Sequence, residues 1–172
     1  MITEKIFTRG NGEKVRYSQI GSIVADYIAK APNASYEITV GSDSQNHKCT
    51  RMVEVIAVHR IGDGGIFFYR KQDIPKIRVL KTKIQEETSR SIENATGFVD
   101  ALAYALIDYD IDLEQMSNDG RFTFAVHADI GHAGKTNQLI TEITSWIKTC
   151  GFEVAIKPDS YAASGIANRI TK

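Results

Sequence analysis

Five short segments of the chain carry the alternating or continuous apolar pattern that predicts β-strands. In the first of them, the apolar residues Tyr36, Ile38 and Val40 alternate with polar residues. The five segments are Tyr36–Gly41, Met52–Val58, Ile66–Tyr69, Phe122–Val126 and Phe152–Ile156. Short connections join the first three segments, and one connection carries the turn sequence Gly62-Asp63-Gly64-Gly65. The pattern therefore predicts that these three strands pair as an antiparallel meander.

Apolar residues at helical spacing predict the helices of the chain. A short helix is expected to begin at Ser18, which is a suitable N-cap, and to end at Ala31-Pro32-Asn33. Longer helices are predicted over Lys81–Ile107 and Lys135–Lys148, and a short terminal helix over Ser160–Ile170. We expect irregular structure over residues 1–17 and an acidic connector over residues 108–120.

The order of these elements indicates the fold class. Three hairpin-linked strands are followed by helix, strand, helix, strand and helix. Strands that are separated by helices run parallel, so the last two strands should be parallel. We therefore predict one α/β domain over residues 1–172, with a mixed five-stranded sheet, flanking helices and an extra N-terminal helix.

Composition and charge restrict the possible functions. The 42% of hydrophobic residues indicates a folded chain, and the net charge of zero argues against a general polyanion binder. The two cysteines, Cys49 and Cys150, form no Cys-x-x-Cys motif, so a zinc ribbon or a thioredoxin-type site is not expected. No apolar run has the length of a signal peptide or a membrane span, and we therefore expect a cytoplasmic protein that does not bind membranes.

Four acidic residues carry the candidate chemistry. Asp43, Asp129 and Asp159 follow predicted strands, and Glu87 lies in the long helix. If the strands lie side by side in one sheet, their ends converge and these carboxylates meet. A carboxylate cluster with few cationic partners needs a divalent cation. Mg²⁺ or Mn²⁺ bound by carboxylate oxygens is suited to the hydrolysis of phosphodiesters.

Three sequence stretches show a resemblance to a known family. They are Tyr36–Gln45, His127–Gly131 and Lys157–Ser164. With this order of elements, the chain resembles the ribonuclease H-like superfamily and, within it, the bacterial YkuK family. The superfamily places carboxylates on its first strand, in its first long helix, after its fourth strand and near its last helix. The resemblance implies metal-dependent phosphodiester chemistry on nucleic acid, whether RNA, DNA or a hybrid, with one or two metal ions.

Two of the proposed ligand positions have alternatives. Glu86 competes with Glu87, but Glu87 shares a helix face with the small residues Ser91 and Ala95, whereas Glu86 shares one with charged and polar residues. Asp159 is either a fourth ligand or the N-cap of the terminal helix. Related nucleases often place an Asp in the last helix, where this chain has Asn168. An amide oxygen there would be a weaker metal ligand, which favours a partly decayed site.

Other residues near the carboxylates are candidates for substrate binding. They are Ser44, Gln45, His127, His132, Lys135, Lys81 and Lys83. Lys81 and Lys83 belong to a basic stretch that begins at Lys71, and such a stretch is suited to backbone phosphates. Residues 131–136 resemble a phosphate-binding P-loop, but the pattern requires glycine where the chain has Asp129, so we expect no nucleotide binding.

The sequence therefore predicts a metal-dependent nuclease. The alternative is a non-catalytic module of the same fold that binds nucleic acid or protein through a partly decayed metal site. A third hypothesis is a nucleotide-binding enzyme that uses residues 131–136.

Overall fold

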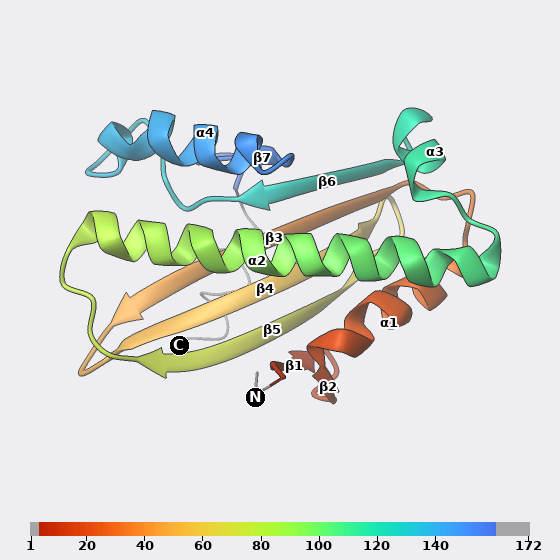
Figure 1. The fold of residues 1–172 in the computed structure, drawn as a ribbon, viewed down its shortest axis with the longest axis horizontal. Coiled ribbons are helices and arrows are strands. Elements are labelled where there is room, and N and C mark those ends of the chain that lie inside the picture. Colours follow the sequence, from red (N-terminus) through yellow and green to blue (C-terminus); the bar gives the residue numbers. More distant parts are fainter. Residues whose placement is uncertain (1–3, 161–172) are drawn as a thin grey trace.

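A computed structural model describes residues 4–160 of the chain. One mixed sheet runs through the molecule in the order β2-β1-β5-β4-β3-β6-β7 (Figure 1). The strands are β1 Ile6–Arg9, β2 Lys14–Arg16, β3 Tyr36–Asn46, β4 Thr50–Arg60, β5 Gly65–Ile74, β6 Phe122–His127 and β7 Glu153–Ala155. The α-helices are α1 Tyr17–Ala29, α2 Leu80–Leu106, α3 Leu113–Asn118 and α4 Ile140–Thr149, and the 3₁₀ turns are η1 Ile107–Tyr109 and η2 Asn137–Leu139.

The mixed α/β class is confirmed, but the strand number is wrong. β3, β4 and β5 form the predicted antiparallel meander, and β6 and β7 run parallel to β3. β1 and β2 add a hairpin in the segment expected to be irregular, and β1 pairs with β5 at Tyr69 and Phe68. Only Phe7 and Val15 of this hairpin are buried apolar residues, so its strands are too short to give a periodic signal.

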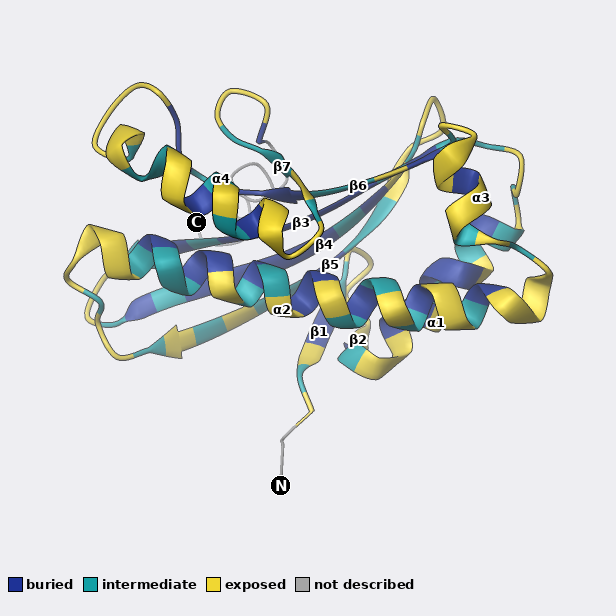
Figure 2. Cartoon of the chain, turned by 45° about the horizontal axis from the view of Figure 1, so that its top comes forward, coloured by how far each residue is buried: buried dark blue, intermediate teal, exposed yellow. Residues whose placement is uncertain are grey.

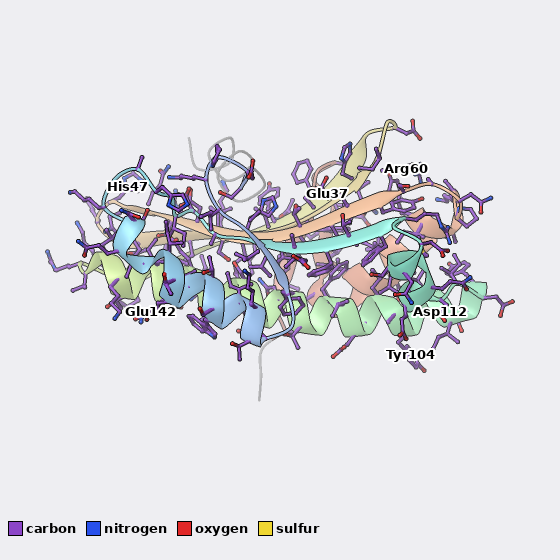
Figure 3. The ribbon with its side chains drawn as sticks, turned by 90° about the horizontal axis from the view of Figure 1, so that it is seen from above. Glu37, His47, Arg60, Tyr104, Asp112 and Glu142 are labelled. Carbon is purple, nitrogen blue, oxygen red and sulfur yellow. The ribbon has the colours of Figure 1, made fainter. Side chains whose placement is uncertain are left out.

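All four described α-helices lie on one side of the sheet (Figure 3). The buried residues of α2 face the sheet and form the core with α1 and the inner face of β3 and β4 (Figure 2). Gly21 lets α1 approach α2 closely, because a Cβ at this position would lie 2.8 Å from the backbone carbon of Ala101. None of the helices in residues 4–160 is long and apolar enough to cross a membrane.

The strands are longer than the pattern predicts, and this changes the setting of Asp43. β3 continues past Gly41 to Asn46, so Asp43 lies inside the strand and not after its end. Ser42 and Ser44 break the apolar alternation, yet both are buried. Their hydroxyls bond to side chains of α2, which satisfies polar groups that would otherwise make a buried strand unfavourable.

Helix boundaries differ where turns replace the expected helix. α2 agrees closely with its prediction and continues through Gly97, where a Cβ would meet the Tyr17 hydroxyl. α4 begins at Ile140 and not at Lys135, because turns and η2 occupy the preceding residues. α3 was not expected in the acidic connector; the side chain of Asp112 caps it. α1 begins one residue before Ser18, and the predicted terminal helix lies outside the described residues from residue 161.

Candidate functional site

Three of the four predicted carboxylates come together in the structure. Asp43 lies inside β3, Glu87 in the second turn of α2, and Asp129 two residues after β6. Because β6 pairs in parallel with β3 and opposes His127 to Gly41, Asp43 and Asp129 each lie two residues beyond this pair, toward the same end of the sheet. Their proximity is evident from their electrostatic effects: the charge of Asp129 raises the pKa of both Asp43 and Glu87.

Glu87 is the most enclosed of the three carboxyls. Only 4% of the residue is exposed, and its Oε1 accepts a hydrogen bond from the Ser44 hydroxyl at 2.5 Å. Burial raises the pKa of Glu87 to about 8, with the negative charge of Asp43 adding to the effect and the Ser44 hydrogen bond opposing it. Glu86 instead points away and forms an ion pair with Arg90 at 2.7 Å.

Asp43 is less enclosed but shares the same electrostatic setting. Burial and the negative charge of Asp129 together raise its pKa to about 6, while Lys83 and Lys157 oppose the shift. The Ser44 amide donates to Asp43 Oδ1 at 2.8 Å. Ser44 therefore holds two of the carboxyls at once, through its amide and its hydroxyl.

Asp129 has an incompletely satisfied oxygen. Its Oδ1 is buried and accepts no hydrogen bond from the described residues, although Lys157 Nζ lies 2.9 Å away in an ion pair. A carboxylate oxygen normally accepts more than one bond when it is buried, so Asp129 retains capacity for another partner.

The fourth carboxylate is not part of this group. Asp159 is exposed, and none of the interactions found among residues 4–160 links its side chain to the other three carboxylates. Its own amide bonds to the Ile156 carbonyl at 2.8 Å. Asn168 lies outside the described residues.

Some of the predicted substrate-binding residues lie near the carboxyls, and others are exposed or paired elsewhere. His127 is buried, and burial lowers its pKa, so the imidazole is neutral near pH 7. Lys83 is close enough to lower the pKa of both Asp43 and Glu87. Lys81 is instead in an ion pair with Glu142 of α4 at 3.3 Å. Gln45 is half-buried, and His132 and Lys135 are exposed in the turns before η2.

The P-loop resemblance finds no support in the backbone. Residues 131–136 form turns, and no α-helix begins among them, so their amides do not make a helix N-terminus. Instead, the Gly131 amide donates to Thr136 Oγ1 at 3.1 Å.

The donor set is chemically suited to a hard cation but is not arranged as a closed cage. Among residues 4–160, no group of three or more His, Cys, Asp or Glu side chains lies close enough together to hold a metal ion. However, carboxylate oxygens are the preferred ligands of Mg²⁺ and Mn²⁺, and among residues 4–160 the contact of Asp129 Oδ1 is its ion pair with Lys157. The residues therefore fit such an ion in their chemistry, and side-chain movements would have to bring their oxygens together.

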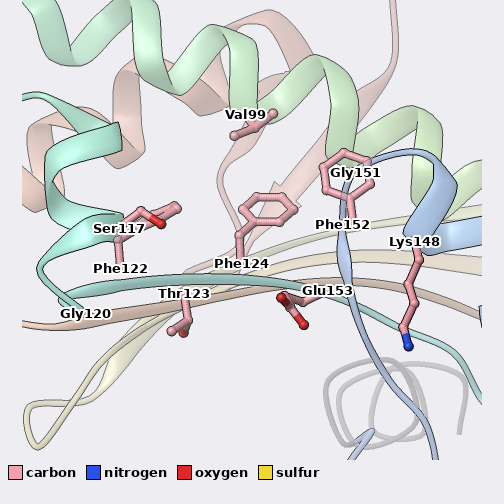
Figure 4. A pocket seen from close by; sticks show the side chains of 10 residues that line it. All are labelled: Val99, Ser117, Gly120, Phe122, Thr123, Phe124, Lys148, Gly151, Phe152 and Glu153. Atoms are coloured by element: carbon pink, nitrogen blue, oxygen red, sulfur yellow. The ribbon is translucent and has the colours of Figure 1, made fainter.

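Two cavities differ in their relation to this site. A cavity of about 10 Å³, large enough for about one water molecule, lies between α2 and β6 and is lined by Glu87, Asp129 and His127 among others. A much larger groove of about 1120 Å³ lies beside Phe124 and Phe152 and shares no residue with the acidic group (Figure 4). This groove is therefore not at the carboxylates.

Sequence reasoning missed one residue of the site. Lys157 forms the ion pair with Asp129, but it was noted only as part of a terminal motif. No local sequence signal locates it, because the parallel pairing of β6 and β7 becomes irregular after His127 and Ala155. The Lys157 amide bonds to the Ile130 carbonyl, two residues beyond the position that the register would give.

Comparisons with known proteins identify the family. The family model described as ribonuclease H-like matches residues 19–172. The chain is also 36% identical over 148 residues to the uncharacterized protein YkuK of Bacillus subtilis (strain 168), an alignment that covers 85% of each chain. No solved structure gives a significant match. On these two matches, the chain belongs to the ribonuclease H-like family.

Proposed function

We propose that this protein is a metal-dependent phosphodiester hydrolase that acts on nucleic acid. The observation that carries the proposal is the convergence of Asp43, Glu87 and Asp129 from three separate elements. Burial and mutual repulsion raise the pKa of two of these carboxyls, so ionising them costs folding free energy. A bound divalent cation would offset that cost. Family membership supports nucleic acid as the substrate class.

In this proposal the chain supplies and orients oxygen ligands. Asp43, Glu87 and Asp129 would hold Mg²⁺ or Mn²⁺, and a bound ion would activate water and stabilise the leaving oxygen. Ser44 fixes the carboxyls of Asp43 and Glu87 through its amide and hydroxyl. It is therefore a positioning residue, whereas the sequence suggested a contact to substrate. Asp159 is exposed and would have to approach from the rim as a fourth ligand, together with Asn168.

Contacts to the substrate backbone would come from a few side chains. Lys83 lies beside the carboxyls, and His132 and Lys135 are exposed on the adjacent turns. Lys81 contributes less, because Glu142 already neutralises it. Gln45 extends along β3 from Asp43 and offers an amide to a phosphate or base.

The deciding experiment is a Mn²⁺ titration by calorimetry, since it needs no choice of substrate. We expect saturable binding to the wild type, loss of binding in Asp43→Asn, and unchanged binding in the control Glu86→Gln. Nuclease assays with RNA, DNA and hybrid duplexes would then be run with the same variants. Cleavage that survives Asp43→Asn would exclude this centre as the catalytic site.

One observation favours the non-catalytic alternative. Lys157 already neutralises Asp129, as expected of a site that holds no metal. A binding module of this kind would bind nucleic acid in EDTA, and the Asp43→Asn variant would bind equally well.

A further inference from the structure

The pairing of β6 and β7 continues beyond their assigned ends and brings Lys157 to Asp129. His127 is paired with Ala155 in the parallel ladder. The Ala128 amide then donates to the Ala155 carbonyl at 2.9 Å, and the Lys157 amide to the Ile130 carbonyl at 2.8 Å. The second bond is displaced by two residues from the β6–β7 register, so Lys157 lies opposite Gly131, and its side chain reaches back to Asp129. Its contact with Asp129 is thus fixed by a backbone hydrogen bond next to the acidic centre.

Gly131 provides the space through which the Lys157 side chain passes. A Cβ at Gly131 would lie 2.9 Å from Lys157 Cβ and 3.7 Å from Lys157 Cδ. The shorter of these distances is too close for two carbon atoms, so any larger residue would push the lysine away from its present course. The absence of a side chain at Gly131 and the backbone bond at Ile130 together direct the ammonium to Asp129.

The charge of Lys157 reaches beyond its direct partner. Its Nζ lies 2.9 Å from Asp129 Oδ1, and its field also lowers the pKa of Asp43. The Lys157 side chain is 53% exposed, whereas that of Asp129 is 20% exposed. A lysine with a flexible four-carbon stem at such a position can swing into solvent without any change of the backbone.

We propose that Lys157 is an exchangeable counter-ion of the acidic centre, which occupies Asp129 in the metal-free protein and leaves when a divalent cation binds. The inference rests on the proposed function, because it concerns the same three carboxylates. It explains why the carboxylates are close yet form no closed metal cage: one oxygen of Asp129 faces an ammonium. The lysine would lower the affinity for metal and protect the metal-free site from charge repulsion.

The test measures Mn²⁺ affinity by calorimetry in wild type and in Lys157→Met, which retains an unbranched stem without the charge. We expect the dissociation constant to fall about tenfold, because the cation no longer displaces an ammonium from Asp129. Lys148→Met, which removes an exposed lysine from α4, controls for the change in net charge and should alter the affinity less than about twofold.

A metal-free measurement checks the ion pair itself. In EDTA at pH 8, Lys157→Met should melt at a lower temperature than wild type. The same substitution should cause no such loss in the Asp129→Asn background, where the pair is already broken. Equal losses in both backgrounds would show that Lys157 acts through packing and would overturn the counter-ion role.

The calorimetric outcomes separate the two proposals. Tighter binding in Lys157→Met, or binding that appears only in this variant, supports the exchange. Binding to wild type with unchanged or weaker affinity in Lys157→Met overturns the exchange and leaves the proposed metal centre intact. Absence of binding in both proteins overturns the metal centre and the exchange together.

Discussion

Replacing Glu87 by glutamine tests whether ionisation of this buried carboxyl destabilises the folded protein. Glutamine has nearly the same shape, and its carbonyl oxygen can still accept the hydrogen bond from the Ser44 hydroxyl. The substitution therefore removes the ionisation of Glu87 with little change in packing. We expect the metal-free variant to be more stable than wild type at pH 8 and about equally stable at pH 5.

The magnitude follows from the pKa of Glu87, which burial raises from 4.5 to about 8. A carboxyl with a raised pKa holds its proton more strongly in the folded state, so its stabilising effect is complete below about pH 4.5 and is lost as the pH rises toward 8. Each pKa unit corresponds to about 1.4 kcal/mol, which gives a loss of roughly 3–4 kcal/mol between pH 5 and pH 8. For a chain of this size, that is a rise in melting temperature of roughly 6–16 °C for the variant at pH 8.

Thermal unfolding in EDTA at several pH values between 5 and 8 would measure this effect. Glu86→Gln is a matched control on the same helix turn, because Glu86 is partly exposed and paired with Arg90, and its loss should cost less than about 1 kcal/mol at any of these pH values. The reasoning is refuted if wild type and Glu87→Gln lose stability in parallel as the pH rises.

Three further predictions concern the site and the core. Mn²⁺ binding at pH 7 should release about one proton, because Glu87, with a pKa of about 8, is mostly protonated at this pH and must ionise; calorimetric heats that do not vary with the buffer's ionisation enthalpy would contradict this. In a denaturant titration, Gly21→Ala should lower the free energy of unfolding by roughly 1–3 kcal/mol, because its Cβ would lie 2.8 Å from the Ala101 backbone. Ser22→Ala, at an exposed position, should have little effect in the same titration. Glu54→Gln should lower the free energy of unfolding by roughly 3–5 kcal/mol, because Glu54 is fully buried and pairs with Arg70 at 2.7 Å. Glu93→Gln is its control, because the Glu93 side chain is 68% exposed. Similar losses of stability in the two variants would argue against a contribution from the buried pair.

Long and strongly periodic elements could be predicted from sequence. The pattern located α2 to within one residue at each end and gave the β3–β5 meander, because these elements bury a continuous apolar face. The β1–β2 hairpin escaped prediction, since its stability comes from pairing with β5, a contact distant in sequence. The end of β3 was also missed by the prediction. Its final residues include buried serines that bond to α2, and these break the apolar pattern.

The candidate site was predictable only in part. The position of Glu87 on the inner face followed from helical phase, and the approach of Asp43 and Asp129 followed from the expectation that strand ends converge in one sheet. The role of Ser44 as a clamp on two carboxyls depends on the distance between β3 and α2, which no local pattern contains. Lys157 depends on how the segment after β7 packs against residues 128–131, which is set only when the sheet forms.

The edge formed by β5 has a consequence for solubility at high concentration. β1 pairs with β5 at Tyr69 and Phe68, and β5 then continues to Ile74 beyond those positions. An unpaired strand edge invites another chain to add to the sheet. The continuing segment carries the charged residues Arg70, Lys71 and Asp73, and an added strand would have to remove these charges from water. The residues that face solvent along this edge therefore oppose edge-to-edge aggregation of the folded protein.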